Sequence, residues 1–462
     1  MIEKQLLEEL LGIAVSTGAD FAEVFVQQER SNQIRLLSGK IESVRDFLLA
    51  GVGIRAFLGT KTYYASTSDT SRAGLLKCAA AVAGAVGDAS VPAGGLVTGL
   101  INEPVQSEKI KYLPDDVPAA RKAEILREAS DAAANLDEKI SQVQGTYMDV
   151  DRHFLVANTE GLCREDRKIR TRLAINVVAS DGGENQSGFY GPGGGMGIEF
   201  FEKVSPKAAG ERAAKQALTN LSAIYCPAGT MTVAIENGFG GVIFHEACGH
   251  SLEATSVGIG ASQMAGKLGQ QIANPKVTAI DDGTIPHGWG SFAIDDEGNP
   301  ARRNVLIENG ILKNYMIDRL GSRRMGMPMT GNSRRENYTY EPTSRMTNTF
   351  IDNGPDQNED IIASIEYGLY AKAMGGGSVN PLTGEFNFSV KEGYLVRNGK
   401  ICEPVRGASL IGTGAQILRD IDMVGQNLAT GQGVCGSSSG SVPTDVGQPL
   451  IRVSKITVGG RS

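Results

Sequence analysis

Hydrophobic and polar positions near the start of the chain repeat first with a helical period and then with a strand period. Apolar residues recur at helical spacing over residues 2–17 and again over about 70–86, which predicts two amphipathic helices. Between them, residues 21–66 alternate with a period of two and are interrupted at Ser38-Gly39 and Leu58-Gly59. This stretch predicts four or five antiparallel strands joined by tight turns.

The same succession returns after a connector. Residues 90–118 are rich in proline and glycine, which is typical of a connecting segment. A helix is expected from there to about residue 137, followed by strands over 140–180. The glycines of 188–197 predict a flexible loop, and Ser205-Pro206 has the residue types that begin a helix.

After residue 225 short strand patterns dominate and helical patterns become few. Asn309-Gly310 and Asn398-Gly399 lie between such strands and carry the signal of two-residue hairpin turns. Residues 238–254 are the exception, because their apolar positions predict a buried helix that packs against the sheet.

These patterns predict an α+β protein with an N-terminal antiparallel sheet and flanking helices, followed by a β-rich C-terminal domain. A chain of 462 residues is too long for one ordinary core. The expected division is an N-terminal domain of residues 1–224, with possible subdomains 1–90 and 115–224, and a C-terminal domain of residues 225–462.

Composition and charge narrow the class of protein. The 59 glycines fit many tight turns, and the net charge of −7 argues against a general nucleic-acid binder. The N-terminus lacks the pattern of a signal peptide, and no apolar stretch approaches the length of a membrane span. The six cysteines are scattered without C-x-x-C pairs, so we expect free thiols in a cytoplasmic protein.

The stretch "HEACGH", residues 245–250, carries the clearest chemistry. It resembles the H-E-x-x-H helix of zinc hydrolases, but the second histidine comes one residue late. On a regular helix, positions i and i+5 differ by roughly 140° in direction, so His245 and His250 could not bind one ion. The metal hypothesis therefore requires a bulge or a break between Glu246 and His250, and Gly249 would permit either.

From spacing alone, several alternatives stay open. The third ligand could be Cys248, Glu253, Cys435, which we expect in a glycine-serine loop, or a distant acid. The two histidines could also be purely structural, as we expect for His153 and His287, which fit surface or hydrogen-bonded roles.

Five segments together resemble the TldD/PmbA family of cytosolic metallopeptidases, which have also been described as modulators of DNA gyrase. They are "GGVIFHEACGHSLEA", "NVLIENGILKNYMIDR", "TGNSRREN", "PTSRMTNTFI" and "VCGSSSGSVPTDVGQPLIRVSKITVGG". The resemblance extends over essentially the whole chain. It is to the TldD kind, which carries the metal set, and not to the PmbA (TldE) kind, which lacks it. One departure is the serine-rich "SSSGS" after Cys435-Gly436, where relatives often carry a lysine and a glutamine.

The resemblance implies a zinc-dependent peptidase with His245, His250 and Cys435 as Zn²⁺ ligands and Glu246 as the general base. It implies unfolded or extended peptides as substrates, bound with low sequence specificity as an added strand inside a dimer-enclosed cavity. The dimer would be a homodimer or a heterodimer with a PmbA-type (TldE) partner. Seven arginines could guide peptide carboxylates, although such residues more often form solvated faces or ion pairs: 302, 303, 323, 324, 334, 335 and 345.

Two other classes of function compete with the peptidase. One is a non-enzymatic regulatory or assembly protein linked to gyrase-toxin biology, which the metal set and the negative charge disfavour. The other is a copper-like redox site with two histidines and one cysteine, in which Glu246 would have no role.

Overall fold

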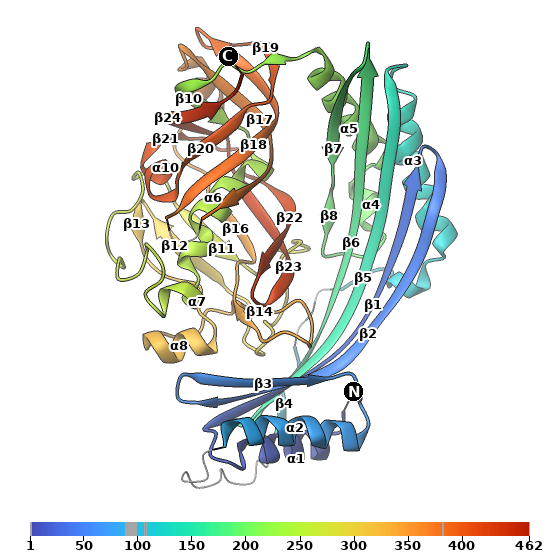
Figure 1. Ribbon diagram of the computed structural model, residues 1–462, viewed down its shortest axis with the longest axis vertical. Helices are drawn as coiled ribbons and strands as arrows, with labels where there is room; N and C mark the ends of the chain where they lie inside the picture. The colour runs from blue at the N-terminus through green and yellow to red at the C-terminus, as the bar shows by residue number, and fades with distance from the viewer. Residues whose placement is uncertain (1, 88–98, 106, 108, 381–382, 462) are drawn as a thin grey trace.

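The chain folds into a long curved sheet along one side of the molecule and a β-rich unit packed beside it (Figure 1). The computed structural model describes residues 2–87, 99–105, 107, 109–380 and 383–461. Part of the predicted connector, residues 90–98, lies outside the described residues. The predicted α+β class, with a sheet-rich C-terminal region, is confirmed.

The N-terminal sheet has the strand order β3-β2-β1-β5-β6-β4, and β7 and β8 also pair with β6. All its pairings are antiparallel except that of β4 with β6. Its strands are β1 (Phe21–Leu37), β2 (Lys40–Leu58), β3 (Lys61–Thr67), β4 (Ile101–Asn102), β5 (Ile140–Asn158), β6 (Leu162–Asp181), β7 (Glu184–Tyr190) and β8 (Gly193–Gly194).

The strands are longer and fewer than predicted. Residues 21–66 form three strands and not four or five, because the polar run 27–33 lies in the middle of β1. β1 is paired there with β2 on one side and β5 on the other, so its backbone groups are satisfied without a turn. The turns at Ser38-Gly39 and after Leu58 are confirmed, and Ser38 takes a positive φ of 43°.

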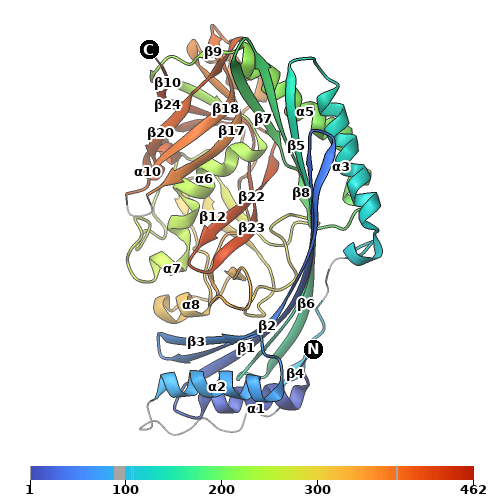
Figure 2. The same cartoon turned by 45° about the vertical axis from the view of Figure 1, so that its right-hand side comes forward.

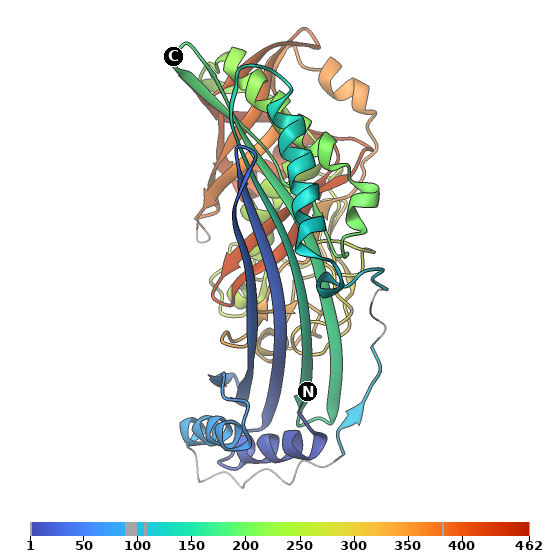
Figure 3. The same cartoon turned by 90° about the vertical axis from the view of Figure 1, so that its right-hand side faces the viewer.

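Helices cover the sheet at its two ends. α1 and α2 pack against one end of β1 and β2, and α3 and α5 pack against the other end of β5 and β6 (Figures 1 and 3). Ser71 and Ser205 cap α2 and α5 through their hydroxyl oxygens, as the sequence indicates for Ser205. The helices are α1 (Lys4–Val15), α2 (Arg72–Val86), the 3₁₀ helix η1 (Pro114–Asp116), α3 (Ala119–Ala134), α4 (Phe200–Lys203) and α5 (Pro206–Ser222).

The glycine-rich segment 188–197 is not simply a flexible loop. Its first three residues end β7, and Gly193 and Gly194 form β8 beside β6. A side chain at Gly193 would come within 3.1 Å of the backbone oxygen of Thr171 and of the Trp289 ring. The glycines therefore permit close packing, which the sequence pattern alone did not reveal.

The C-terminal unit contains two larger sheets around one core. The first has the order β17-β10-β24-β20-β18-β19-β9, with β21 beside β24, and the second has the order β13-β12-β11-β16-β23-β22. Their strands are β9 (Ile224–Tyr225), β10 (Gly229–Ile235), β11 (Ala279–Asp282), β12 (Arg303–Glu308), β13 (Ile311–Leu312), β16 (Asn348–Ile351), β17 (Tyr367–Val379), β18 (Glu385–Arg397), β19 (Lys400–Arg406), β20 (Ser409–Thr413), β21 (Ile421–Val424), β22 (Ala429–Ser437), β23 (Gly440–Gln448) and β24 (Ile451–Gly459), while β14 (Ser333–Arg334) and β15 (Thr343–Ser344) form a separate pair.

The short connections of this unit follow the predicted turn chemistry. Asn309 and Asn398 both adopt φ near 48° and join β12 to β13 and β18 to β19, so both Asn-Gly hairpins are confirmed. The helices are η2 (Gly238–Gly241), α6 (Val242–Ala247), η3 (Gly249–Leu252), α7 (Ala254–Val257), α8 (Arg319–Met325), α9 (Asn358–Ala363) and α10 (Gly414–Asp420). None of the helices within the described residues combines the length and apolar character that a membrane crossing needs.

One sheet runs through both predicted N-terminal subdomains, because β1 of the first pairs with β5 of the second from Glu23 to Leu37 (Figure 2). The two units meet in a buried cluster that includes Phe25 and Phe154 from the sheet and Ile294 and Tyr338 from the C-terminal unit. The boundary between domains at residue 224 stays a prediction.

Candidate metal centre

The helix that carries both histidines breaks between them. α6 ends at Ala247, Cys248 takes a φ of −131° and a ψ of −43°, and the 3₁₀ helix η3 begins at Gly249. Because the helix is interrupted, the angle of roughly 140° between positions i and i+5 no longer applies, and the two imidazoles can face the same point. The predicted interruption between Glu246 and His250 is confirmed.

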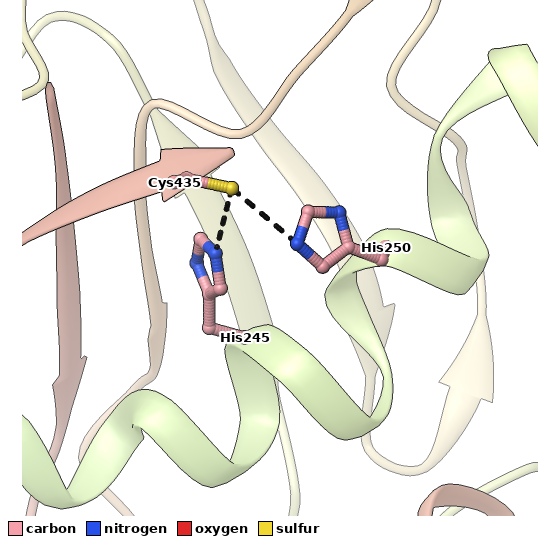
Figure 4. Close-up of side chains that lie close together, drawn as sticks. All are labelled: His245, His250 and Cys435. Atoms are coloured by element: carbon pink, nitrogen blue, oxygen red, sulfur yellow. Dashed lines mark hydrogen bonds between the residues drawn. The ribbon is translucent and has the colours of Figure 1, made fainter. Parts of the chain in front are cut away.

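The break brings both imidazoles to one cysteine thiol (Figure 4). His245 Nε2 lies 3.2 Å from Cys435 Sγ, and His250 Nε2 lies 3.3 Å from the same sulfur, although His245 and Cys435 are 190 residues apart in the chain. The three candidate ligand atoms all lie within 4.8 Å of one another. A tetrahedral zinc site with ordinary Zn–N and Zn–S bonds would separate nitrogen and sulfur by roughly 3.5 Å. The cluster is therefore close to the size of such a site.

Cys435 reaches the histidines from a strand and not from a loop. It belongs to β22 and pairs with Val442 of β23, and the serine-rich segment after it forms the end of this hairpin. The buried Arg345 guanidinium donates to the Cys435 carbonyl at 2.5 Å and to the Ser439 hydroxyl at 2.9 Å. Arg345 thus holds both the strand and the turn of this hairpin.

A carboxylate orients the second histidine. Glu253 Oε2 lies 3.1 Å from His250 Nδ1, which leaves Nε2 facing the sulfur. Such a carboxylate contact is the usual support of a metal-binding imidazole. Glu253 therefore contacts the ring nitrogen of His250 that faces away from Cys435, and it is not one of the three grouped candidate ligands.

The electrostatics of the cluster favour a thiolate. Burial alone would raise the pKa of Cys435, but the charges and hydrogen bonds of His245 and His250 outweigh it and lower the pKa to about 3. Burial lowers the pKa of His250, whereas Glu253 and Cys435 raise it, and the net direction is well above its ordinary value. Without a metal these directions favour a thiolate beside an imidazolium; a divalent metal would use the same thiolate with neutral imidazoles, so its binding would release the proton of His250.

Glu246 lies at the more open side of the cluster. Its Oε2 is 3.8 Å from His250 Nε2, the nitrogen that faces Cys435. Its side chain is 28% exposed, compared with 17% for His250. The carboxylate therefore adjoins the ligand atoms while remaining reachable from solvent.

The other sequence candidates lie elsewhere. The Cys248 thiol is directed toward the Gly414 carbonyl at 3.5 Å, and burial raises its pKa. His153 is a half-exposed residue 3.5 Å from Glu165, and His287 contacts the Gly195 carbonyl, so neither joins the cluster.

Several of the seven arginines are structural and not exposed guides. Arg334, Arg335 and Arg345 are almost fully buried and donate to backbone or side-chain oxygens of the C-terminal unit and the sheet. Arg303 and Arg323 form ion pairs with Asp352 and Asp20.

A cavity of about 840 Å³ lies beside β22, and sequence reasoning did not identify it. It is lined by β6, β7 and α5 on one side and by β17, β18 and β22 on the other, and Val434, the neighbour of Cys435, is part of its wall. Among the described residues, β22 pairs only with β23, so no strand pairs with its other edge. A second cavity of about 430 Å³ lies between β6 and residues 283–301. The candidate ligands line neither cavity, but only the first one reaches the residue next to Cys435.

Models of one family match three segments of the chain. They are the PmbA/TldA metallopeptidase domain 1 over residues 22–85, the central domain over 112–221 and the C-terminal domain over 228–460. The third match includes the whole His-His-Cys cluster.

Relatives of known sequence match along their full lengths. The chain is 38% identical to the "Metalloprotease TldD homolog" of Haemophilus influenzae, over 99% of this chain and 97% of that protein. It is 33% identical to a "Metalloprotease" of Methanothermobacter thermautotrophicus, over 96% of both chains.

Solved structures share the fold at lower identity. A Thermotoga maritima protein, described as a modulator of a DNA gyrase, superposes with a TM-score of 0.78 at 23% identity, over 99% of this chain and 100% of that one. TldE from Thermococcus kodakarensis superposes with a TM-score of 0.77 at 19% identity, over 98% and 100%.

Proposed function

The chain belongs to the PmbA/TldA metallopeptidase family, and from that premise we propose that it is a zinc-dependent peptidase acting on unfolded or extended peptides. One observation carries the proposal: the buried Cys435 sulfur contacts two imidazoles, and a carboxylate lies 3.8 Å from one of them.

His245, His250 and Cys435 would hold the ion, with a fourth position left for water or substrate. When bound, zinc would supply Lewis acidity and lower the pKa of a coordinated water toward neutrality. The donor set fits this ion, because two imidazoles and one thiolate recur in catalytic zinc sites. A redox role is less well supported, since Glu246 would then have no function.

Glu246 would act as the general base and acid. Its carboxylate would take the proton of the attacking water and later give it to the leaving amine nitrogen. The partial exposure of the side chain and its place beside His250 suit both transfers.

The peptide would bind as an added strand on the edge of β22 that pairs with no described strand. Main-chain hydrogen bonds would hold it, which explains why little side-chain specificity is expected. The exposed side chain of Val434 and the adjoining 840 Å³ cavity leave room for such a strand beside Cys435.

We further propose that the protein works in the cytoplasm as a dimer, either with itself or with a PmbA-type (TldE) partner, and that it binds neither nucleic acid nor membrane. The net charge of −7 opposes nucleic-acid binding. Among the described residues, the outer edge of β2 from Lys40 to Gly51 pairs with no strand and exposes Val44, Phe47 and Leu48. An open apolar edge of this kind suits association with a second chain.

Replacement of Glu246 by glutamine tests the mechanism. We expect about one zinc per chain in both the wild type and the variant, and peptide cleavage only in the wild type. Full cleavage by Glu246→Gln would refute the assigned role. A wild type that binds zinc but cleaves neither casein nor unstructured peptides would favour the regulatory alternative.

A further inference from the structure

Three positively charged side chains line the cavity beside β22 without a carboxylate partner. They are Arg172 of β6, Arg212 of α5 and Lys391 of β18, and we call them the cation cluster. Within the described residues, no carboxylate oxygen lies within the 4.0 Å ion-pair distance of their charged nitrogens. The two other lysines of the cavity differ, because Lys215 pairs with Glu211 and Lys372 with Glu392.

Aromatic rings and backbone groups hold the cation cluster in place. The Arg212 guanidinium lies 4.2 Å from the centre of the Tyr190 ring, and Lys391 Nζ lies 4.8 Å from that of Phe189. Arg172 donates through Nη2 to the Gln432 carbonyl at 3.2 Å, and its buried Nε has no hydrogen-bond partner. These contacts orient the cations, and the Asp445 carboxylate near Arg172 offsets part of its charge without forming an ion pair.

The cavity has an excess of positive charge, since five lysine and arginine side chains and three glutamates line it, and such an excess favours an anionic ligand. Burial lowers the pKa of Arg172, which reflects the cost of keeping its charge away from water. A carboxylate that entered the cavity would offset this cost and could accept charge-assisted hydrogen bonds from the guanidinium.

The position of Arg172 defines where such a carboxylate would lie. Gln432, its hydrogen-bond partner, is three residues before Cys435 on β22. A strand rises about 3.3 Å per residue, so this point lies about 10 Å from the candidate metal ligand. A peptide antiparallel to β22 would run with its C-terminus toward Ala429 and would pass the cation cluster after the reacting bond.

We propose that the cation cluster binds a peptide carboxylate about three residues on the C-terminal side of the cleaved bond. The carboxylate is either the free C-terminus of the substrate or the side chain of an aspartate or glutamate at that position. This inference rests on the proposed function, and it adds a charge preference to an otherwise sequence-tolerant peptidase.

Three versions of one neutral, unstructured peptide test the proposal, with cleavage sites assigned by mass spectrometry. The first has a free acid three residues after the cleaved bond, the second has an amide there, and the third is amidated with glutamate at that position. We expect kcat/KM to be about tenfold higher for the carboxylate versions that use the cluster, and the preference to shrink at high salt. Preference for the first alone identifies the C-terminus as the ligand, and preference for the third identifies the side chain.

Variants assign any preference to the cluster. Arg172→Met and Lys391→Met should each reduce several-fold the ratio of kcat/KM between the carboxylate and amide versions, and Arg172→Lys should retain part of this ratio. Arg127→Met, which removes an exposed arginine of α3 outside the cavity, serves as the control. Fluorescence anisotropy of labelled peptides on metal-free protein should give the same order of affinities.

The outcomes separate the two proposals. If all three peptides are cleaved and bound equally, the carboxylate site is refuted and the peptidase stands. If none is cleaved but the metal-free protein binds the carboxylate peptides more tightly, the peptidase is refuted and the site stands. Equal binding without cleavage refutes both.

Discussion

Replacement of Gly249 by alanine tests whether the break in the histidine-bearing helix depends on close packing. An added Cβ would lie 2.3 Å from Met346 Sδ and 3.1 Å from its Cε, well inside van der Waals contact. Met346 is fully buried, so its side chain can move only by disturbing the core. Overpacking of this kind costs about 1–3 kcal/mol, and a displaced η3 would also move His250 away from Cys435.

Thermal unfolding and zinc analysis measure both effects. A loss of about 1–3 kcal/mol corresponds to a fall in Tm of roughly 2–12 °C for a unit of this size. Gly249→Ala should therefore melt earlier and bind zinc more weakly. Gly84→Ala is the matched control, because nothing lies within 4 Å of a Cβ at that exposed position of α2. Alanine there should leave zinc binding unchanged and stabilise the helix by about 0.5–1 kcal/mol.

A second substitution identifies the clash as the cause. Met346→Ala alone should destabilise the protein by about 2–5 kcal/mol through the cavity that it leaves. The double variant Gly249→Ala/Met346→Ala should lose less stability than the sum of the losses in the two single variants, because the new methyl group fills part of that cavity. Strict additivity, or a Gly249→Ala variant that melts and binds zinc like the wild type, would contradict the packing argument.

The remaining predictions concern the ligands and the contact between the two units. Cys435→Ala should abolish zinc binding, whereas Cys248→Ala should keep the metal and lose only packing. Metal analysis of both variants shows which cysteine is the third ligand. Loss of zinc from Cys248→Ala alone would assign Cys248 and not Cys435. A chelator should lower the Tm of the protein. Added zinc should raise the Tm again by an amount that grows with the logarithm of the free zinc concentration, since the ion stabilises only the folded state that binds it. An unchanged Tm would count against a structural contribution of the metal. Burial raises the pKa of Asp296, but Lys168 and Arg152 of the sheet outweigh it and hold the pKa below its usual range. Because the folded pKa lies below the unfolded one, this stabilisation is present above about pH 4 and is lost as the pH falls further. Asp296→Asn should cost about 3–5 kcal/mol at neutral pH and flatten the acid-side decline in urea unfolding; a parallel decline would disprove the role.

Local chemistry predicted those parts of the fold that depend on neighbouring residues. The Asn-Gly turns, the serine cap of α5 and the break between Glu246 and His250 all follow from conformational preferences or from the demand of one ion. Strand length was not predictable in this way, because the polar middle of β1 is stabilised by β2 and β5, which pair with it from distant parts of the chain.

The candidate site, too, was predictable only where it depends on neighbouring residues. Spacing alone left Cys248, Cys435 and Glu253 as possible third ligands, and only the resemblance to a family favoured Cys435. The cavity and its cations could not be anticipated, since Arg172 and Lys391 come from different units and meet only across the folded interface. Arg172 stands in an alternating basic run on β6, "RKIRTR", and that run is the one signal in the sequence that could have drawn attention to it.

The separation of 190 residues between His245 and Cys435 has a consequence for biosynthesis. At ordinary rates of translation, the thiolate follows the first histidine by roughly 10–40 s. A nascent chain that has made only "HEACGH" holds two of the three proposed ligands, so we expect it to bind zinc weakly and to cleave nothing. A chain truncated before β22 should show the same deficit in metal analysis. The order of residues would thus keep the peptidase inactive until its own sheets have been made.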